Sequence, residues 1–314
     1  MRTDMGKTER TLLVKLLPKF AVVITLTALF LGGMPRANGQ RLPAGKYHPI
    51  RERQFDILHY RADLTVDIGG KRVSGKAALR LVPLRKLQEI RLDAIRLEAR
   101  RVTAQSPAAK GNLSFRTGEE TLSVELPQPA MPGDTLSLAI EYSCAPNAGM
   151  FFQRDPEHPG EWFVFTYGEG GLSANWLPIY SDVNDKFSTE MVITVPRPYT
   201  AISNGRLLSI ADAPQNMRTF HWLQQKPHSS YLIALYIGDF EYGKLGNVDG
   251  VPAGFWVPRG HLEEGRYVFR KPPEMIRFFA RRFGYPYPWA KYDQVAVPDY
   301  AIGGMEHTTV AGVR

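Results

Sequence analysis

Alternation of apolar and polar residues, the pattern typical of a half-buried β-strand, dominates the sequence after residue 55. The first two alternating segments, 60–68 and 73–81, are separated by Gly69 and Gly70 and predict a β-hairpin. Further alternating segments follow at similar spacing: 89–97, 121–126 and 136–142. No segment of helical period interrupts them, so residues 55–145 are predicted to form an antiparallel sandwich without a parallel β-α-β unit.

The composition changes between residues 151 and 180, where aromatic residues and glycines accumulate, and a loop-rich segment is predicted there. Strands are predicted again in three segments: 190–195, 199–202 and 219–223. The segment 231–240 is almost continuously apolar and is predicted to be a strand buried on both faces.

The last part of the chain contains segments with the two-residue period of a strand and one segment with the period of a helix. A strand is predicted at 251–257, and a helix from Pro272 to the residue before Gly284, because proline favours helix starts and glycine favours helix ends. The apolar residues at helical spacing are expected to lie in the core: Met275, Ile276, Phe279 and Phe283. A final alternating strand, 292–297, leads to two glycines, where the backbone has room to approach a ligand.

Composition excludes some functions. The chain has 314 residues, 44% of them hydrophobic, which is enough for a large core and for two domains. The formal net charge is +8, but no basic run is interleaved with aromatic residues, so no nucleic-acid partner is predicted. Cys144 is the only cysteine, and it is expected to be a small buried residue outside any internal disulfide.

Residues 1–39 have the organisation of a secretory signal peptide. A basic stretch ending at Lys19 precedes an uncharged apolar run at 20–31, and small residues follow at 37–39. The apolar run has 12 residues, against about 20 needed to cross a bilayer, so no stable membrane span is expected. We expect export to the periplasm or the extracellular space; the alternative is a membrane anchor formed by an uncleaved signal.

A distinctive pattern ends at Glu306. Its residues are Phe283, Gly284, Pro286, Tyr287, Pro288, Lys291, Asp293, Val295, Pro298, Asp299, Gly303, Met305 and Glu306. With them the chain resembles the zinc aminopeptidase family of aminopeptidase N and leukotriene-epoxide hydrolase, the gluzincin metallopeptidases. The family pattern F-G-x-P-Y-P-x-x-K-x-D-x-V-x-x-P-D-x-x-x-G-x-M-E-N marks the substrate-binding edge strand. The chain departs from it at the last position, where His307 replaces Asn.

Two other segments are similar to the same family. Glu169 and Pro178 keep the nine-residue spacing of a second family motif, although Ser181 and Val183 depart from the bacterial relatives. Residues 231–240 resemble the strand that closes the family's amino-terminal domain. The resemblance implies a mainly β protein: a saddle-like antiparallel β-sandwich domain at 45–245 and, at 246–314, the first β/α part of a thermolysin-like catalytic domain.

The resemblance also implies zinc in a complete family member. The family holds zinc with two histidines of an H-E-x-x-H helix and a further glutamate. The seven histidines of this sequence include no pair four residues apart. The chain is therefore expected to be truncated before the zinc motif, to bind no zinc itself and to be inactive alone.

The substrate-binding residues that the resemblance implies are Glu169, Gly303, Gly304, Met305, Glu306 and His307. The two glutamates are expected to hold the free α-ammonium of a peptide, because a cation in a pocket needs a carboxylate partner. The glycines would allow the peptide main chain to pair along an open strand edge. His307 is either neutral and hydrogen-bonding like Asn, or charged and weakening the anionic pocket at low pH.

The sequence is compatible with three functions. The leading one is the amino-terminal part of an exported zinc aminopeptidase that removes N-terminal residues from peptides. The second is a non-catalytic peptide-binding or assembly scaffold with the same fold, which the missing zinc motif favours. The third, a carbohydrate-binding sandwich protein, explains the aromatic residues of 151–180 but not the pattern at 283–306.

Overall fold

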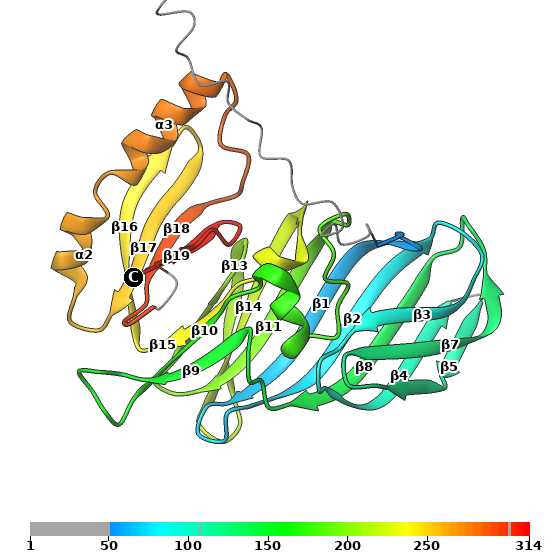
Figure 1. Cartoon of the computed structure of the whole chain (residues 1–314). Helices are drawn as coiled ribbons and strands as arrows, with labels where there is room; N and C mark the ends of the chain where they lie inside the picture. Colours follow the sequence, from blue (N-terminus) through cyan, green and yellow to red (C-terminus); the bar gives the residue numbers. More distant parts are fainter. Residues whose placement is uncertain (1–50, 107, 301–302) are drawn as a thin grey trace, which may run out of the picture. The chain divides into compact units, whose positions relative to one another are not determined.

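A computed structural model describes residues 51–106, 108–300 and 303–314, so the predicted signal peptide lies outside the described residues. The described chain is mostly β-strand, arranged in four sheets (Figure 1). Eight strands form the largest sheet, in the order β13-β14-β11-β1-β2-β8-β4-β5. Their bounds are β1 Phe55–Asp67, β2 Arg72–Pro83, β4 Glu98–Ser106, β5 Ala109–Asn112, β8 Leu136–Cys144, β11 Phe187–Pro196, β13 Arg206–Ala213 and β14 Met217–His228.

Three smaller sheets have three, four and five strands. The first contains β3 Leu87–Asp93, β7 Thr121–Ala130 and β6 Phe115–Thr117, and the second β12 Thr200–Ser203, β15 Leu235–Gly238, β10 Trp162–Thr166 and β9 Met150–Arg154. The third contains β16 Phe240–Val248, β17 Val251–Pro258, β18 Tyr292–Ala296, β20 Val310–Val313 and β19 Gly304–Met305. The helices are η1 Glu169–Asn175, η2 Ser230–Leu232, α2 Leu262–Val268 and α3 Pro272–Phe283.

The hairpin predicted from the first alternating segments is confirmed. β1 and β2 pair antiparallel, with Ala62 opposite Ala77, and their apolar positions are buried. Strands β3 and β7 contribute Ile90 and Leu122 to the same core, so two sheets enclose it as a sandwich. Burial of each such side chain contributes about 1.5–3 kcal/mol, which is why alternation determines which face of a strand points inward. Cys144 is buried and free, as predicted.

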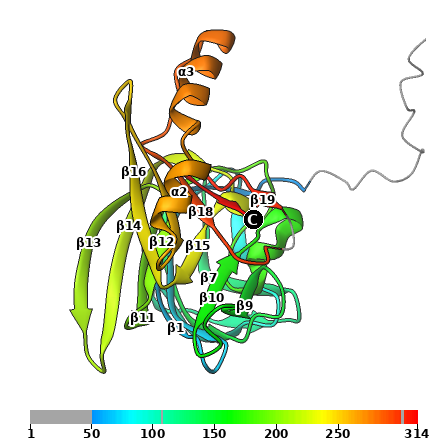
Figure 2. The same ribbon diagram turned by 90° about the vertical axis from the view of Figure 1, so that its left-hand side faces the viewer.

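One strand pairing differs from the predicted antiparallel arrangement. β1 pairs in parallel with β11, with Tyr60 opposite Thr189. Figure 2 shows β13, β14, β11 and β1 following one another in the sheet. This pairing joins the first hairpin to residues 187–228 in a single sheet. Alternation predicts that a segment is a strand, but it carries no information on a partner so distant in sequence.

The prediction for the middle of the chain needs correction. The segment expected to be loop-rich contains β9 and β10, which were missed because Phe163, Val164 and Phe165 are all buried and leave no alternation. The segment 231–240 is buried as expected, but it is not one strand. It contains the end of η2 and β15, and then the first residue of β16, which belongs to another sheet.

The segment predicted as a strand over 89–97 also ends early. β3 stops at Asp93, and Arg96 adopts a φ of 55°, in the left-handed region that interrupts a strand. β13 and α2 were not predicted. β13 has an almost entirely exposed surface, and α2 has only seven residues and contains Gly265.

Helix α3 begins and ends where the sequence predicts, with Pro272 at its start and Gly284 in the left-handed conformation after it. The expectation that its apolar residues lie in the core is wrong for the described chain. Met275 is 52% exposed, Phe279 49% and Phe283 73%. Helices α2 and α3 both lie against β16 (Figure 1). No helix in the described part of the chain has both the length and the apolar character to cross a membrane.

Strand β18 lies in the interior of the five-stranded sheet. It lies between β17 and β20 and pairs in parallel with both, and Val295 is fully buried. The edge of this sheet is the short strand β19, which contains Gly304 and Met305.

Candidate functional site

Glu169 lies at a sharp turn that glycines make possible. Gly168 precedes it at a position without room for a side chain, because a Cβ there would lie 2.3 Å from the carbonyl oxygen of Tyr231. Gly170 and Gly171 follow with φ of 70° and 84°, values that residues with a Cβ rarely adopt. The turn leaves the Glu169 side chain exposed at the start of η1.

The predicted glycines lie at the open edge of the five-stranded sheet. β19 pairs antiparallel with β20, with Gly304 opposite Val313, and has no other strand neighbour among the described residues. Gly303 has a φ of 77°, whereas Met305 is buried and fixes the strand to the core. An exposed strand edge of this kind accepts another extended chain through main-chain hydrogen bonds.

The charges of Glu169 and Glu306 raise the pKa of the same two tyrosines, Tyr167 and Tyr231. The Tyr167 hydroxyl donates a hydrogen bond to Glu169 Oε2. This bond, with partial burial and the charges of Glu169 and Glu306, raises the pKa of Tyr167. Burial and the charges of the same two glutamates raise the pKa of Tyr231. Because charges near water act strongly only over short distances, the two carboxylates share one region of the surface.

This region is anionic and has no balancing cation in the described part of the chain. No lysine, arginine or histidine nitrogen there lies within 4.0 Å of a carboxylate oxygen of Glu169 or Glu306. A cation bound close to these carboxylates lowers the electrostatic energy of the region, because it balances their negative charge. A primary ammonium suits them, because it presents three N–H donors to carboxylate acceptors.

His307 does not share this exposed surface. Its side chain is 2% exposed, and Nδ1 lies 2.7 Å from the Tyr236 hydroxyl oxygen. Burial and the proximity of His228 lower the pKa of His307 to about 3. Of its two predicted states the structure supports the neutral one, because a charged imidazole in this position has no access to water.

The segment after Glu306 is fixed by residues that the sequence analysis missed. Asn204 Nδ2 donates to the Thr308 carbonyl oxygen at 2.6 Å, and the Gly205 N–H donates to Thr309 Oγ1 at 2.7 Å. His228 Nδ1 lies 3.2 Å from Thr308 Oγ1. These residues lie outside the family pattern, and the only sequence signal for them is the pair of hydroxyl side chains directly after His307.

Comparison with known protein families identifies the fold. The Peptidase M1 N-terminal domain matches residues 57–232, and the Peptidase family M1 domain matches residues 267–314. The chain belongs to the M1 peptidase family. The predicted resemblance to the family of aminopeptidase N and leukotriene-epoxide hydrolase is thereby confirmed.

The M1 relatives are aminopeptidases and a related hydrolase, at low sequence identity. Aminopeptidase N of Acetobacter pasteurianus is 23% identical over 257 residues, which are 80% of this chain and 71% of that protein. Human aminopeptidase B is 27% identical over 280 residues, which are 81% of this chain and 42% of that protein. Aminopeptidase M1 of Arabidopsis thaliana is 25% identical over 50% of this chain and 18% of its own length. The chain thus spans only part of each of these relatives.

Solved M1 structures confirm the predicted fold class. The M1 zinc metallopeptidase of Deinococcus radiodurans superimposes with a TM-score of 0.73 and 20% identity, over 84% of this chain and 61% of that one. The structure of a variant of that enzyme with the substrate Tyr-Ser-Ala has the same TM-score and 21% identity. The described chain is therefore an M1-type β domain followed by the start of an M1 catalytic domain.

Residues that could ligate a metal ion are few in the described part of the chain. One group of potential ligands occurs in the described part of the chain, formed by Asp155, His158 and Glu161 in the loop between β9 and β10. Asp155 Oδ1 already accepts the backbone N–H groups of Glu157 and His158, so this carboxylate holds the loop together. We assign no zinc ligand to it.

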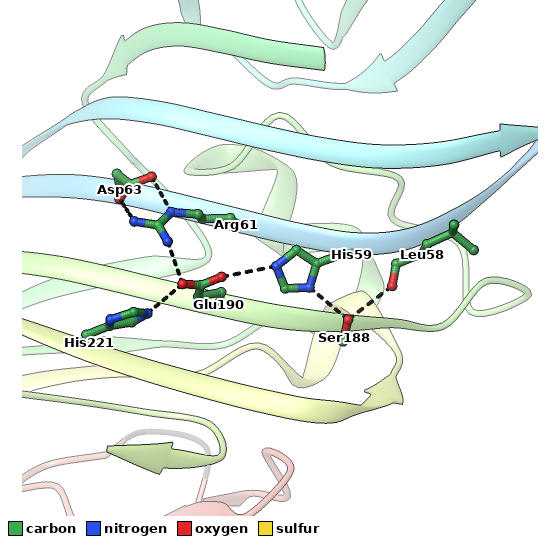
Figure 3. A network of polar contacts seen from close by, with 7 residues as sticks. All are labelled: Leu58, His59, Arg61, Asp63, Ser188, Glu190 and His221. Carbon is green, nitrogen blue, oxygen red and sulfur yellow. Dashed lines mark hydrogen bonds and ion pairs between the residues drawn. The ribbon is translucent and has the colours of Figure 1, made fainter. Parts of the chain in front are cut away.

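A second polar cluster lies on the eight-stranded sheet (Figure 3). Arg61 Nη1 donates to Glu190 Oε1 at 2.5 Å, and His221 Nε2 lies 2.6 Å from the same oxygen. His59 Nε2 lies 3.2 Å from Glu190 Oε2. Both oxygens of Glu190 are thus occupied by groups from β1 and β14, and the cluster joins these strands to β11. In contrast to the region around Glu306, it leaves no carboxylate free for a ligand.

Proposed function

We propose that this chain is the amino-terminal part of an exported zinc-dependent aminopeptidase that removes N-terminal residues from peptides. In this proposal the chain supplies the surface that binds the substrate's amino end. The observation that supports it is that the charges of Glu169 and Glu306 both raise the pKa of Tyr167 and Tyr231. Neither glutamate forms an ion pair within the described chain. An ammonium group is the cation that a peptide with a free amino end brings.

The two carboxylates would determine which peptide bond is cleaved. An enzyme that removes one residue at a time must recognise the free amine and must hold the first peptide bond at a fixed distance from it. Hydrogen bonds between an ammonium and a carboxylate are charge-assisted and stronger than those between neutral groups. Binding the amine in this region therefore sets the register of the substrate against the catalytic groups.

Strand β19 would bind the substrate main chain. Gly303 and Gly304 have no side chains that block the approach of an extended peptide, and β19 has a free edge in the described chain. Main-chain hydrogen bonds along such an edge hold a peptide with little dependence on its sequence. Glu306 directly follows this strand, so a paired peptide and an anchored amine are compatible.

The zinc chemistry in this proposal belongs to the complete protein. The 314 residues contain no H-E-x-x-H sequence, so we expect this chain alone to bind no stoichiometric zinc and to cleave no peptide. Export is proposed from the signal-like organisation of residues 1–39. Amino-terminal sequencing of the exported product should find a mature end near Gln40, whereas Met1 on membrane-bound material would support the anchor.

The experiment compares Glu306→Gln and Glu169→Gln in a complete protein, obtained from the full gene or by joining a relative's catalytic half to this chain. Loss of one partner of a charge pair costs about 2–5 kcal/mol, so kcat/KM on a free-amine substrate should fall about 30-fold or more. Zinc content should not change. Glu119→Gln, an exposed glutamate in the turn before β7, is the matched control and should change kcat/KM less than about twofold. Equal, mild effects of Glu306→Gln and Glu119→Gln would refute the role of Glu306.

The second candidate is a non-catalytic peptide-binding scaffold of the same fold. The free edge of β19 is compatible with it, because such an edge binds an extended peptide whether or not cleavage follows. The two proposals share the amine site and differ in turnover. A complete protein that binds free-amine peptides but hydrolyses no aminoacyl anilide in the presence of zinc would establish the scaffold.

A further inference from the structure

Two buried histidines lie beneath the segment that carries Glu306. His228 is the last residue of β14, and His307 directly follows Glu306. Each side chain is 2% exposed. His228 contacts the side chain of Thr308, the residue after His307, so both histidines lie at the same segment although β14 and residues 306–309 are distant in sequence.

The hydrogen-bond partners of both imidazoles are neutral hydroxyl groups. His228 Nε2 lies 2.9 Å from Thr189 Oγ1, and His228 Nδ1 lies 3.2 Å from Thr308 Oγ1. His307 Nδ1 lies 2.7 Å from the Tyr236 hydroxyl oxygen. His307 Nε2 is buried and has no hydrogen-bond partner in the described part of the chain. A neutral imidazole is compatible with these contacts.

No carboxylate oxygen in the described part of the chain lies within 4.0 Å of a ring nitrogen of His228 or His307. The titratable groups packed against the two histidines are Tyr236 on β15 and, behind that residue, Tyr300, and both phenols are neutral in acid. β11 contributes Thr189, and the segment after His307 contributes Thr308. Glu306 is exposed, and no ion pair involving His228 or His307 occurs among the described residues.

Protonation of either ring is therefore unfavourable while the segment stays in place. It would create a cation in an apolar interior with no carboxylate beside it in the described chain, which is strongly unfavourable. Burial accordingly lowers the pKa of His228 to about 3, as it does for His307.

We propose that His228 and His307 are positioning residues that hold the Glu306 segment in place only while both are neutral, so that acidification releases the segment. The release itself follows from the contacts of the two histidines. Only its consequence, the loss of the amine-binding register, rests on the proposed function.

The direction of the effect follows from proton linkage. While the segment is held in place, the pKa of each imidazole is about 3. After release, we expect both imidazoles to have the ordinary histidine pKa of about 6.5. Between these values acid therefore favours release, about tenfold per pH unit for each histidine. Relative to pH 8, the population of the released form at pH 5 should rise about 30-fold for one histidine and about 1,000-fold for both.

Hydrogen exchange of the full 314-residue chain, detected by mass spectrometry, tests the proposal. Exchange is followed at pH 8, 7, 6 and 5, with times corrected for the intrinsic pH dependence of amide exchange. Protection of a peptide covering 303–312 should fall steeply below pH 6.5. Peptides from β2 and β8 serve as the internal reference and should lose much less protection.

Matched variants identify the groups responsible. His307→Asn and His228→Gln keep a neutral hydrogen-bonding side chain, and each should reduce the loss of protection between pH 8 and pH 5 to about 30-fold. The double variant should show no loss beyond that of the reference peptides. His158→Gln, an exposed histidine in the loop between β9 and β10, should behave like the wild type.

Two results would overturn the proposal. One is a wild-type chain in which 303–312 keeps its protection at pH 5, a result that does not depend on any variant folding. The other is a double variant that retains the wild-type pH dependence. If the segment opens as expected but Glu306→Gln leaves kcat/KM of the complete protein unchanged, the release stands and the proposed amine site fails.

Discussion

The eight-stranded sheet and the five-stranded sheet with its helices differ in how completely their apolar side chains are buried. In the first, the alternating residues of β1 and β2 are buried by the facing strands, and Tyr60, Leu64 and Leu79 are at most 2% exposed. In the second, Phe255 is fully buried beneath α2, but Phe279 and Phe283 of α3 are about half exposed or more, at 49% and 73%. Periodicity therefore predicts which side of an element is apolar. Whether the described chain covers that side is a separate property, decided by tertiary structure.

The largest effect should come from the buried ion pair of the second region. Lys291 Nζ lies 2.6 Å from Asp293 Oδ2, and the two side chains are 10% and 4% exposed. Lys291→Met leaves an unpaired buried carboxylate, so we expect a loss of about 3–5 kcal/mol in the free energy of unfolding, measured with urea. The double variant Lys291→Met/Asp293→Leu should recover most of this loss, and a single variant that costs less than about 1 kcal/mol would contradict the account.

A cavity in the first region should cost slightly less. Leu79→Ala removes a buried side chain of β2 and should lower the free energy of unfolding by about 3 kcal/mol. Leu208→Ala is the matched control, because Leu208 on β13 is 51% exposed, and it should change stability by less than about 0.5 kcal/mol. Similar losses for the two variants would mean that the sandwich core is not the main source of stability.

The two regions should also respond to acid with opposite signs. Burial raises the pKa of Asp185, which accepts the Ile57 N–H, to about 6 against an ordinary value of 3.8. The folded chain then binds this proton more tightly than the unfolded chain, so Asp185 contributes stability that is full below pH 3.8 and is lost as the pH rises through 6.

From pH 7 to pH 4 the free energy of unfolding of the wild type should therefore rise relative to Asp185→Asn by about 2 kcal/mol. The histidines near Glu306 act in the other direction, and they are present in both proteins, so their effect cancels in the comparison. Urea unfolding of the two proteins at several pH values provides the measurement. A difference that stays constant from pH 7 to pH 4 would show that Asp185 does not titrate as expected.

The smallest effect should come from the exposed face of α3. Phe283→Ser should change the free energy of unfolding by less than about 0.5 kcal/mol, because the ring is already 73% exposed. Phe255→Ala, which removes a fully buried ring under α2, should cost about 3–5 kcal/mol. A large cost for Phe283→Ser would mean that the α3 face is covered in solution.

Local pattern was sufficient for parts of this fold and insufficient for others. The hairpin of β1 and β2 and the bounds of α3 follow from alternation and from Pro272 and Gly284, which act within a few residues. The parallel pairing of β1 with β11 and the strands β9 and β10 were missed. The pairing of β1 with β11 joins segments that are distant in sequence. Strand β10 is buried on both faces and shows no alternation, and β9 pairs with it.

The candidate site depended on resemblance more than on pattern. Nothing in the spacing of Glu169 and Glu306 indicates that they act on the same tyrosines, and the family motifs alone connected them. His228, Thr189 and Asn204 have neither a motif nor a period that marks them. Their roles depend on contacts made only in the folded chain.

The central claim is that Glu169 and Glu306 form a site for a free α-ammonium. Its most direct test is a titration of this chain with the tripeptide Tyr-Ser-Ala and with its N-acetylated form, followed by NMR. The free-amine peptide should bind and the acetylated one should bind at least tenfold more weakly, a difference of about 1.4 kcal/mol or more. Glu306→Gln should weaken binding of the free-amine peptide by a similar factor, and Glu119→Gln should not. Equal affinity for the two peptides would contradict the claim.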